Sequence, residues 1–247
     1  MTTARSFHAA TSLSDGRVLV TGGIKGGDTG PFIEKSAEIY DPNTGVWRIA
    51  DQMANARYGH TATALSLGRV LITGGAGPGG DCASTVTAEI YDSAAWRPAR
   101  PMAIARGFQT GTLLLNGKIL ITGGNTLPAS CAAITPTAQL YDANTGTWSS
   151  TGSMATGRSG QTATLLPDGR VVAAGGRSFD GSIYGSVATV EVYSPATGVW
   201  SSTGNMSLPR AYHTATLLPD GRVLVCGGHS LGSFNSNQFQ STEIYTP

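Results

Sequence analysis

The sequence predicts an all-β protein folded as a β-propeller, because one pattern of residues recurs through its whole length. The five methionines are spaced by 52, 49, 52 and 52 residues, at Met1, Met53, Met102, Met154 and Met206. An arginine stands four residues after each of them, at Arg5, Arg57, Arg106, Arg158 and Arg210. A period near 50 residues is typical of propellers and other repeat arrays, and no helical periodicity accompanies it.

Further marks follow each arginine in the same register and define five units. In the first unit they are the glycine pair Gly22-Gly23, then Tyr40, then Trp47. The units are residues 1–52, 53–101, 102–153, 154–205 and 206–247, and no linker separates them. We therefore expect a single domain over residues 1–247, in which units stack because each is too small to bury its own faces.

Each unit has the pattern of one propeller blade of four short antiparallel strands. In the fifth unit, residues 211–217 and 222–226 are apolar runs joined by Pro219-Asp220-Gly221. An Asp-Gly step between two such runs is a strong hairpin signal. A third strand is expected at residues 241–245, and in the earlier units a fourth strand carries the tryptophan.

The fifth unit stops after its third strand and lacks the tryptophan strand. Met1 starts just after the point where such a strand would end, so neither terminus supplies it. Three arrangements stay open: a three-stranded blade, a blade completed by a partner chain, or a part of a larger propeller. We favour five blades with the last one incomplete, and its unpaired edge at 241–245 predicts self-association.

The composition argues against several classes of partner. The net charge is +1 with 13% charged residues, which favours neither nucleic acid nor an anionic membrane. No apolar run reaches 18 residues, so no membrane span is predicted, and the N-terminal residues do not have the pattern of a signal peptide. Three lysines against thirteen arginines, with loops rich in Ser, Thr and Gly, favour an extracellular or periplasmic location.

The order and spacing of these marks resemble the signature of kelch repeats. A glycine pair is followed by a tyrosine about 17 residues later and by a tryptophan 5 to 7 residues beyond it. The resemblance covers the whole chain and implies a kelch-type β-propeller, a fold whose members are mostly interaction domains. It does not name a ligand, because fold and function are separate questions.

Polar residues at repeated positions are the first candidates for a site. Three residues after each arginine stand His8, His60, Gln109, Gln161 and His213. A ring of three histidines could hold zinc or copper, but the exchange of His for Gln fits hydrogen bonding to the backbone better. We therefore expect no metal and no cofactor. The five arginines, His8, His60, His213 and Tyr212 are the candidate ligand-binding residues, and no catalytic residue is assigned.

The arginines also have candidate partners of opposite charge. Two residues before each repeat tyrosine stand Glu38, Glu89, Gln139, Glu191 and Glu243. Repeated Arg–Glu pairs, within or between blades, are more often structural than catalytic.

One stretch resembles the copper radical oxidases, the galactose and glyoxal oxidases. By that resemblance Tyr212 and His213 match a copper-ligating Tyr-His pair, and Ala105 to Gln109 matches the segment with the radical tyrosine. Here that position is Phe108, which can form neither a tyrosyl radical nor a thioether link. No cysteine stands in the innermost strands, so the redox cofactor cannot be assembled.

The cysteines and the variable loops leave further alternatives open. Cys82 and Cys131 have the same offset in neighbouring units and could form a disulfide, although equivalent points on adjacent blades usually lie too far apart. Cys226 is expected to be a small buried residue. The loops after the glycine pairs vary most, and they cover residues 24–36, 76–87, 125–137, 177–189 and 229–241. A rigid scaffold with variable loops on one face favours binding.

Two main functional hypotheses follow. The first is a binding or scaffolding propeller that recognises a protein or glycan through its loop face. The alternative is a carbohydrate-active enzyme of kelch fold, a sugar epimerase or an oxidase-like protein, which would need acids, bases or a metal that converge. A third reading is a truncated or engineered propeller piece without independent activity.

Overall fold

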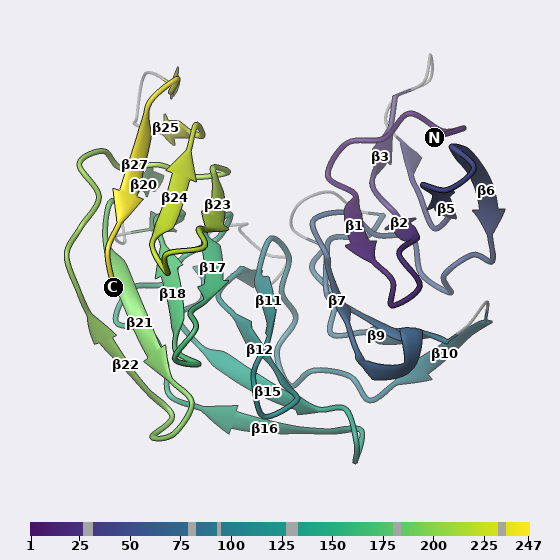
Figure 1. Ribbon diagram of the computed structural model, residues 1–247, viewed down its shortest axis with the longest axis horizontal. Helices are drawn as coiled ribbons and strands as arrows, with labels where there is room; N and C mark the ends of the chain where they lie inside the picture. The colour runs from purple at the N-terminus through teal and green to yellow at the C-terminus, as the bar shows by residue number, and fades with distance from the viewer. Residues whose placement is uncertain (27–31, 79–82, 93–94, 127–132, 180–183, 232–235) are drawn as a thin grey trace. The chain divides into compact units, whose positions relative to one another are not determined.

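The computed structural model describes the chain except residues 27–31, 79–82, 93–94, 127–132, 180–183 and 232–235 (Figure 1). The regular secondary structure of the described residues consists of β-strands, apart from one 3-10 turn at Ser66–Gly68. They contain no apolar helix of membrane-spanning length. The proposed Cys82–Cys131 disulfide lies outside the described residues.

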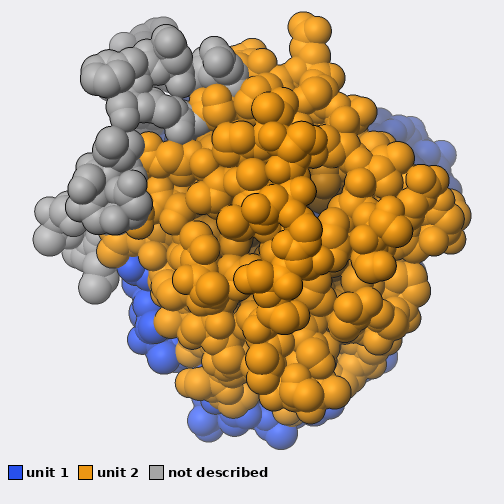
Figure 2. Space-filling view, turned by 90° about the vertical axis from the view of Figure 1, so that its left-hand side faces the viewer, with its two compact units in different colours: residues 1–107, 126–131, 143–148 blue, residues 108–125, 132–142, 149–247 orange. Residues whose placement is uncertain are grey.

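Contacts divide the chain into two compact units (Figure 2). Unit 1 comprises Met1–Gly107, Thr126–Cys131 and Ala143–Trp148, and unit 2 comprises Phe108–Asn125, Ala132–Asp142 and Ser149–Pro247. The organisation of residues 1–247 as a single domain stays a prediction.

The first two repeats form four-stranded antiparallel sheets in unit 1. The first sheet has the order β1 (Ala9–Ser12), β2 (Val18–Thr21), β5 (Ala37–Asp41), β6 (Val46–Ala50). The second has the order β7 (Thr61–Ala64), β8 (Val70–Thr73), β9 (Ala88–Asp92), β10 (Ala95–Ala99). Each strand pairs with the next large strand of its own repeat, as expected for a propeller blade.

The remaining repeats follow the same plan. The third sheet is β11 (Thr110–Leu113), β12 (Lys118–Thr122), β15 (Ala138–Asp142), β16 (Thr147–Thr151). The fourth is β17 (Thr162–Leu165), β18 (Val171–Ala174), β21 (Val190–Ser194), β22 (Val199–Ser202). The fifth has three strands, β23 (Thr214–Leu217), β24 (Val223–Cys226) and β27 (Thr242–Tyr245). The prediction of five blades, the last without its outer strand, is confirmed.

Short hairpins occupy four of the five variable loops that follow the glycine pairs. They are β3–β4 (Ile24–Lys25, Phe32–Ile33), β13–β14 (Asn125–Thr126, Ala133–Ile134), β19–β20 (Arg177–Phe179, Tyr184–Ser186) and β25–β26 (His229–Leu231, Ser236–Gln238). Backbone bridges join the first residue of several of these hairpins to the segment that follows the repeat arginine, as in Ser159↔Arg177 and Ala211↔His229. The variable loops therefore lie at the same end of their blades as the methionine–arginine turns.

The hydrophobic core lies between neighbouring blades rather than inside single ones. In unit 1, Leu19 of β2 packs in one cluster with Met53 and Ile72 of the second repeat. In unit 2, Val192 of β21 packs with Met206 and Val225 of the fifth repeat. Met53 and Met206 thus enter the core shared with the preceding blade, which explains their fixed position, whereas Met1 is exposed. Cys226 is only half-buried, so its expected full burial is wrong, and it is a free thiol.

Tyrosine and tryptophan form cross-strand pairs and also join consecutive repeats. The ring centroids of Tyr193 and Trp200 lie 5.1 Å apart, on the paired strands β21 and β22. The indole Nε1 of Trp200 donates to the carbonyl of Gly152, in the segment that links the third and fourth repeats, at 3.0 Å. Trp96 and Trp148 make the equivalent bonds, so the tryptophan strands of the second, third and fourth blades are each joined to the end of the preceding repeat.

Candidate functional site

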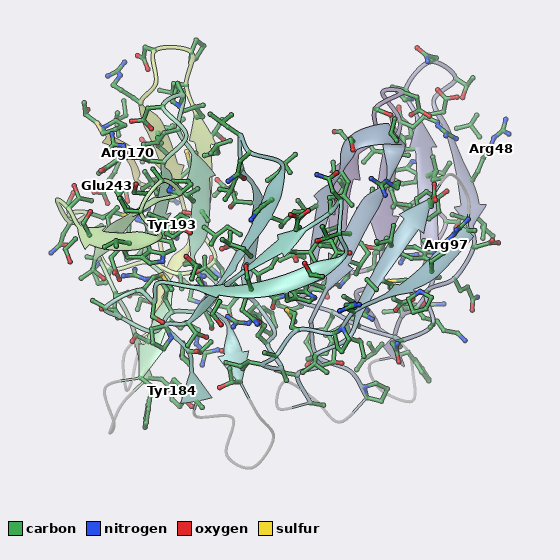
Figure 3. All side chains as sticks on the ribbon, turned by 90° about the horizontal axis from the view of Figure 1, so that it is seen from below. Arg48, Arg97, Arg170, Tyr184, Tyr193 and Glu243 are labelled. Carbon is green, nitrogen blue, oxygen red and sulfur yellow. The ribbon has the colours of Figure 1, made fainter. Side chains whose placement is uncertain are left out.

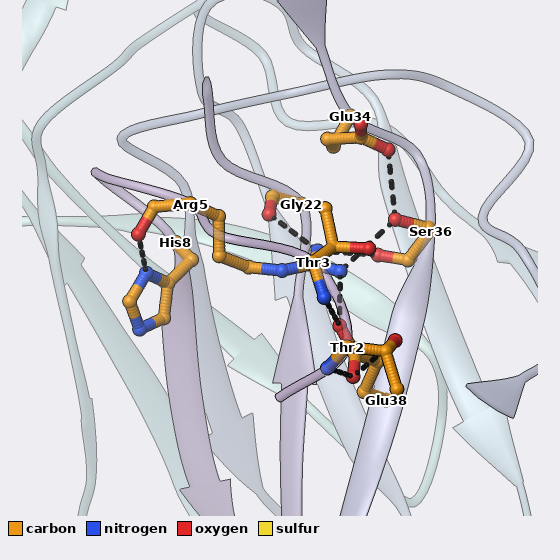
Figure 4. A network of polar contacts seen from close by, with 8 residues as sticks. All are labelled: Thr2, Thr3, Arg5, His8, Gly22, Glu34, Ser36 and Glu38. Carbon is orange, nitrogen blue, oxygen red and sulfur yellow. Dashed lines mark hydrogen bonds and ion pairs between the residues drawn. The ribbon is translucent and has the colours of Figure 1, made fainter. Parts of the chain in front are cut away.

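Both terminal nitrogens of the repeat arginine of the first blade are hydrogen-bonded within its own repeat (Figure 4). Its Nη1 donates to the carbonyls of Gly22 at 2.8 Å and Ser36 at 3.1 Å. Its Nη2 donates to the Ser36 hydroxyl at 3.1 Å and to Oε1 of Glu38 at 2.8 Å. The other carboxylate oxygen of Glu38 accepts the backbone N–H of Thr2 at 2.6 Å. One ion pair therefore holds together the start of the repeat, the glycine pair and the third strand.

Three further repeats reproduce this network within a single blade. The Nη2–Oε1 distances are 2.6 Å for Arg57–Glu89, 2.6 Å for Arg158–Glu191 and 2.7 Å for Arg210–Glu243. In the third repeat, Gln139 stands at the sequence position of the glutamate, and burial lowers the pKa of Arg106 to about 10. Burial also lowers the pKa of Arg158, and the Glu191 carboxylate opposes that shift. The pairs are structural and lie within blades, which settles one alternative left open by the sequence.

The histidines and glutamines three residues after the arginines bind neighbouring strands. Nε2 of His60 lies 2.8 Å from the hydroxyl of Thr21 in the preceding blade, and Nε2 of His213 lies 3.0 Å from that of Thr162. Gln161 donates its amide to the carbonyl of Thr122 at 2.9 Å. Within its own repeat, His8 donates from Nδ1 to the carbonyl oxygen of Arg5, 3.1 Å away. His and Gln are interchangeable here because both place a nitrogen where the adjacent strand has a polar partner.

Burial keeps two of these imidazoles neutral. The pKa of His60 falls to about 3 because burial penalises its charged form and the charge of Arg57 adds to that penalty. The pKa of His213 falls to about 4 for the same two reasons, with Arg210 as the neighbouring charge.

The arrangement does not fit a copper or zinc centre. Within the described residues, no three His, Cys, Asp or Glu side chains come together. His213 directs Nε2 to Thr162, whereas the adjacent Tyr212 contacts His229, so the two side chains do not converge on one point. Phe108 meets Tyr212 edge-on, with ring centroids 6.0 Å apart, in place of a radical tyrosine.

A second set of repeated positions differs from blade to blade. The residue two after each repeat arginine has a positive φ in every blade, and these residues and angles are Phe7 (52°), Gly59 (58°), Phe108 (56°), Gly160 (61°) and Tyr212 (54°). Their backbones connect neighbouring blades, since Gly160 N donates to Phe108 O at 2.9 Å and Tyr212 N donates to Gly160 O at 2.8 Å. Glycine takes this conformation without steric cost, whereas an aromatic residue is strained in it.

Two of these aromatic residues belong to a group of rings around a guanidinium in unit 2, which we call the Arg177 cluster: Phe108, Arg177, Tyr184, Tyr212 and His229. The ring of Tyr212 stacks on that of His229, with centroids 5.2 Å apart and 20° between planes. Nη1 of Arg177 donates to the Tyr212 hydroxyl at 3.4 Å, and its Cζ lies 5.4 Å from the ring centroid of Tyr184. Figure 3 places Tyr184 and Arg170 at opposite ends of the fourth blade.

Sequence reasoning named Tyr212 as a candidate ligand-binding residue and singled out Phe108, but it did not identify Arg177, Tyr184 and His229. Arg177 and His229 follow the glycine pair directly, where the other repeats have Ile24, Ala76 and Asn125. The sequence-based candidates were residues that recur in every repeat. The residues of the Arg177 cluster instead stand at positions where the residue type changes from repeat to repeat. Aligning the five repeats and comparing each column would have found them.

Comparison with known proteins agrees with this description of the repeats. A family model described as Kelch motif matches residues 4–54 and 160–207. The first and fourth repeats match the kelch motif. The solved structure titled "Structure of YjhT" superposes with a TM-score of 0.79 over 97% of this chain and 81% of that chain. The two sequences are 17% identical, so the likeness shows the kelch propeller fold alone.

Two galactose oxidase sequences of Gibberella zeae are similar to this chain over its whole length. Each is 29% identical over 279 aligned residues, which cover 100% of this chain. The chain spans 39% of the length of these curated relatives.

We expect the buried Arg–Glu pair to contribute much more to the free energy of unfolding than an exposed Arg–Asp pair does. Glu191→Ala leaves the Arg158 guanidinium buried without its carboxylate, which should lower the free energy of unfolding by about 3–5 kcal/mol. The control is Asp168→Ala, which removes the exposed partner of Arg170 and should cost about 1 kcal/mol or less. Chemical denaturation of both variants measures the difference, and equal costs would show that the buried pair contributes no more than a surface pair.

The buried histidines predict a dependence of stability on pH. Their folded pKa values lie below the unfolded value of 6.5, so the unfolded chain binds protons first as the pH falls. Their stabilising contribution is complete above pH 6.5 and is lost between that pH and about 4 to 3. Between pH 7 and 5 the loss should be about 2 kcal/mol per histidine.

Substitution by the glutamine of the third and fourth repeats tests this dependence. The double variant His60→Gln/His213→Gln should have a flatter profile of unfolding free energy between pH 7 and 5. Gln161→His, which adds a third buried imidazole, should have a steeper one. If the parent and the two variants showed parallel profiles, the pH dependence could not come from the buried histidines.

Proposed function

We propose that this kelch chain is a binding module that recognises a protein or glycan ligand at the end of its blades where the variable hairpins lie. The observation that carries the proposal is the placement of Phe108 and Tyr212 in a left-handed conformation, where Gly59 and Gly160 serve the same backbone role without strain. Strained residues persist where function requires them. The ring of Tyr212 contacts Arg177 of hairpin β19–β20 and His229 of hairpin β25–β26, within the loops that vary most, and the ring of Phe108 meets Tyr212 edge-on.

The contacts of the repeated arginines and histidines direct the search for a binding site to other residues. Four of the arginines form ion pairs with glutamates, and His60 and His213 are buried and hydrogen-bonded to threonines. These residues were the sequence-based candidates for ligand contact, and their bonds fit an architectural role instead. The Arg177 cluster takes their place in the proposal.

A carbohydrate-active enzyme is the second candidate, favoured by the similarity to galactose oxidase. Its weakness is chemical, since Phe108 and the divergent side chains of Tyr212 and His213 do not fit a copper radical site. An assay for sugar oxidation with added copper separates the two candidates, because a binding module produces no peroxide.

Replacing Tyr212 tests the binding proposal without breaking the fold. Tyr212→Gly restores the residue type that the second and fourth repeats use at this position, and it relieves about 1–2 kcal/mol of left-handed strain. We expect its thermal midpoint to stay close to that of the parent while binding is lost on a glycan array and in affinity capture of protein partners.

Ile49→Ser is the control, since Ile49 is 78% exposed on the outer strand β6 of unit 1. It should keep the binding profile of the parent. A Tyr212→Gly variant that binds every ligand as the parent does would eliminate the Arg177 cluster as the binding site.

We also propose that strand β27 can pair with another copy of the chain. It is hydrogen-bonded to β24 alone among the described strands, whereas the third strand of each other blade has two neighbours. Light scattering should show a mass above the 25.3 kDa of one chain, rising with concentration. A chain extended by the sequence of residues 195–202, the tryptophan strand of the fourth blade, should fill its own edge and be monomeric. A parent mass of 25.3 kDa at every concentration would rule out self-association.

A further inference from the structure

Arg177 differs from the arginines that pair with acids in this chain. The repeat arginines of four blades each contact a glutamate, and Arg17, Arg170 and Arg222 each contact an aspartate two residues earlier. Arg177 is half-buried and has no ion pair with any carboxylate that the structure describes. A guanidinium that is partly removed from water gains more from a bound anion than an exposed one does.

Two aromatic residues hold this guanidinium in a defined orientation. The ring of Tyr184, on the paired strand β20, lies under Cζ, and the hydroxyl of Tyr212 accepts from Nη1. Tyr212 is itself fixed, because His229 stacks on its ring and any side chain added at Gly160 would fall within 3.0 Å of the same ring. The cation is therefore oriented before any ligand arrives, which reduces the entropy lost on binding.

The donor that remains on Arg177 suits a carboxylate. Nη1 is engaged by Tyr212, and Nε is buried without a partner among the described residues, as are the Nε atoms of the repeat arginines, which leaves Nη2 as the donor for a ligand. A charged N–H donor forms a short and strong hydrogen bond with a carboxylate oxygen.

The neighbouring rings define what the carboxylate is attached to. Phe108 and His229 flank Tyr212, and Phe179 packs against Tyr184 with centroids 4.8 Å apart. Aromatic faces beside a guanidinium favour a ligand with a flat or weakly polar ring next to its charge.

We propose that the Arg177 cluster binds small organic acids in which a carboxylate is joined to a ring, with Arg177 as the carboxylate-binding residue. This inference rests on the proposed binding function and specifies its ligand. The ring can be an aryl group or a sugar, because both present a flat apolar face, and the experiment separates these two sources.

The test measures binding of two acids and their neutral counterparts to the whole chain by titration calorimetry and ligand-observed NMR. The pairs are phenylacetate with phenylacetamide, and glucuronate with glucose. At least one acid should bind about tenfold or more tightly than its neutral partner. Binding of phenylacetate alone assigns an aryl ring, and binding of glucuronate alone assigns a sugar. Equal affinity within both pairs, or no binding of either acid, overturns the proposal.

Variants of Arg177 locate the interaction. Arg177→Gln should weaken acid binding about tenfold or more. Arg177→Lys keeps the charge but loses the planar guanidinium, and its affinity should lie between those of the parent and Arg177→Gln. Arg170→Gln, at the opposite end of the same blade, is the matched control and should bind as the parent does. If Arg177→Gln unfolds, Arg177→Lys decides alone.

The result is separable from the test of the binding function. Acid affinity unchanged in the Arg177 variants overturns the carboxylate assignment, whereas the Tyr212→Gly experiment on glycans and protein partners still decides whether the chain is a binding module.

Discussion

The buried arginine of each repeat is the interaction on which the blade depends. One guanidinium bonds the first glycine of the pair, the entry to the third strand and a glutamate on that strand, and the same glutamate accepts N–H groups from the turn after the methionine. The fourth strand takes no part in this network. The fifth blade can therefore lack its fourth strand and still keep an Arg210–Glu243 distance of 2.7 Å. The missing strand leaves the Glu243 side chain 18% exposed, against 2–4% for the corresponding glutamates.

Interactions between blades are of a different kind and tolerate more substitution. They consist of apolar packing around the repeat methionines and of single hydrogen bonds from His60, Gln161 or His213 to the adjacent strand. A neutral imidazole and an amide can both supply such a bond. The imidazole differs in one respect, since its protonation in the unfolded chain makes stability depend on pH.

The fold could be predicted from the sequence because each blade solves the same problem with the same residues. The strand order, the hairpin turns and the incomplete fifth blade followed from the recurring marks. The first strand of the fifth blade starts at Thr214 rather than at residue 211, because the left-handed Tyr212 interrupts the extended backbone. The same repetition misdirected the search for a site: Arg57 and His60 recur because every blade needs them, and a residue that every blade needs is committed to the fold.

The separation between residues that every blade needs and residues that vary explains where a blade can change without unfolding. In four blades the terminal nitrogens of the buried arginine bond to a glutamate of the same repeat, and the residue two after the arginine needs only a left-handed backbone. Glycine meets that need at Gly59 and Gly160, and a ring there can only cost stability unless it does something else. Tyr212 keeps its ring beside Arg177 and His229, which stand at the other position that varies between repeats, and Phe108 meets Tyr212 edge-on. Two variable positions from neighbouring blades thus meet at one place, and the proposed ligand site rests on that convergence rather than on the repeated arginines.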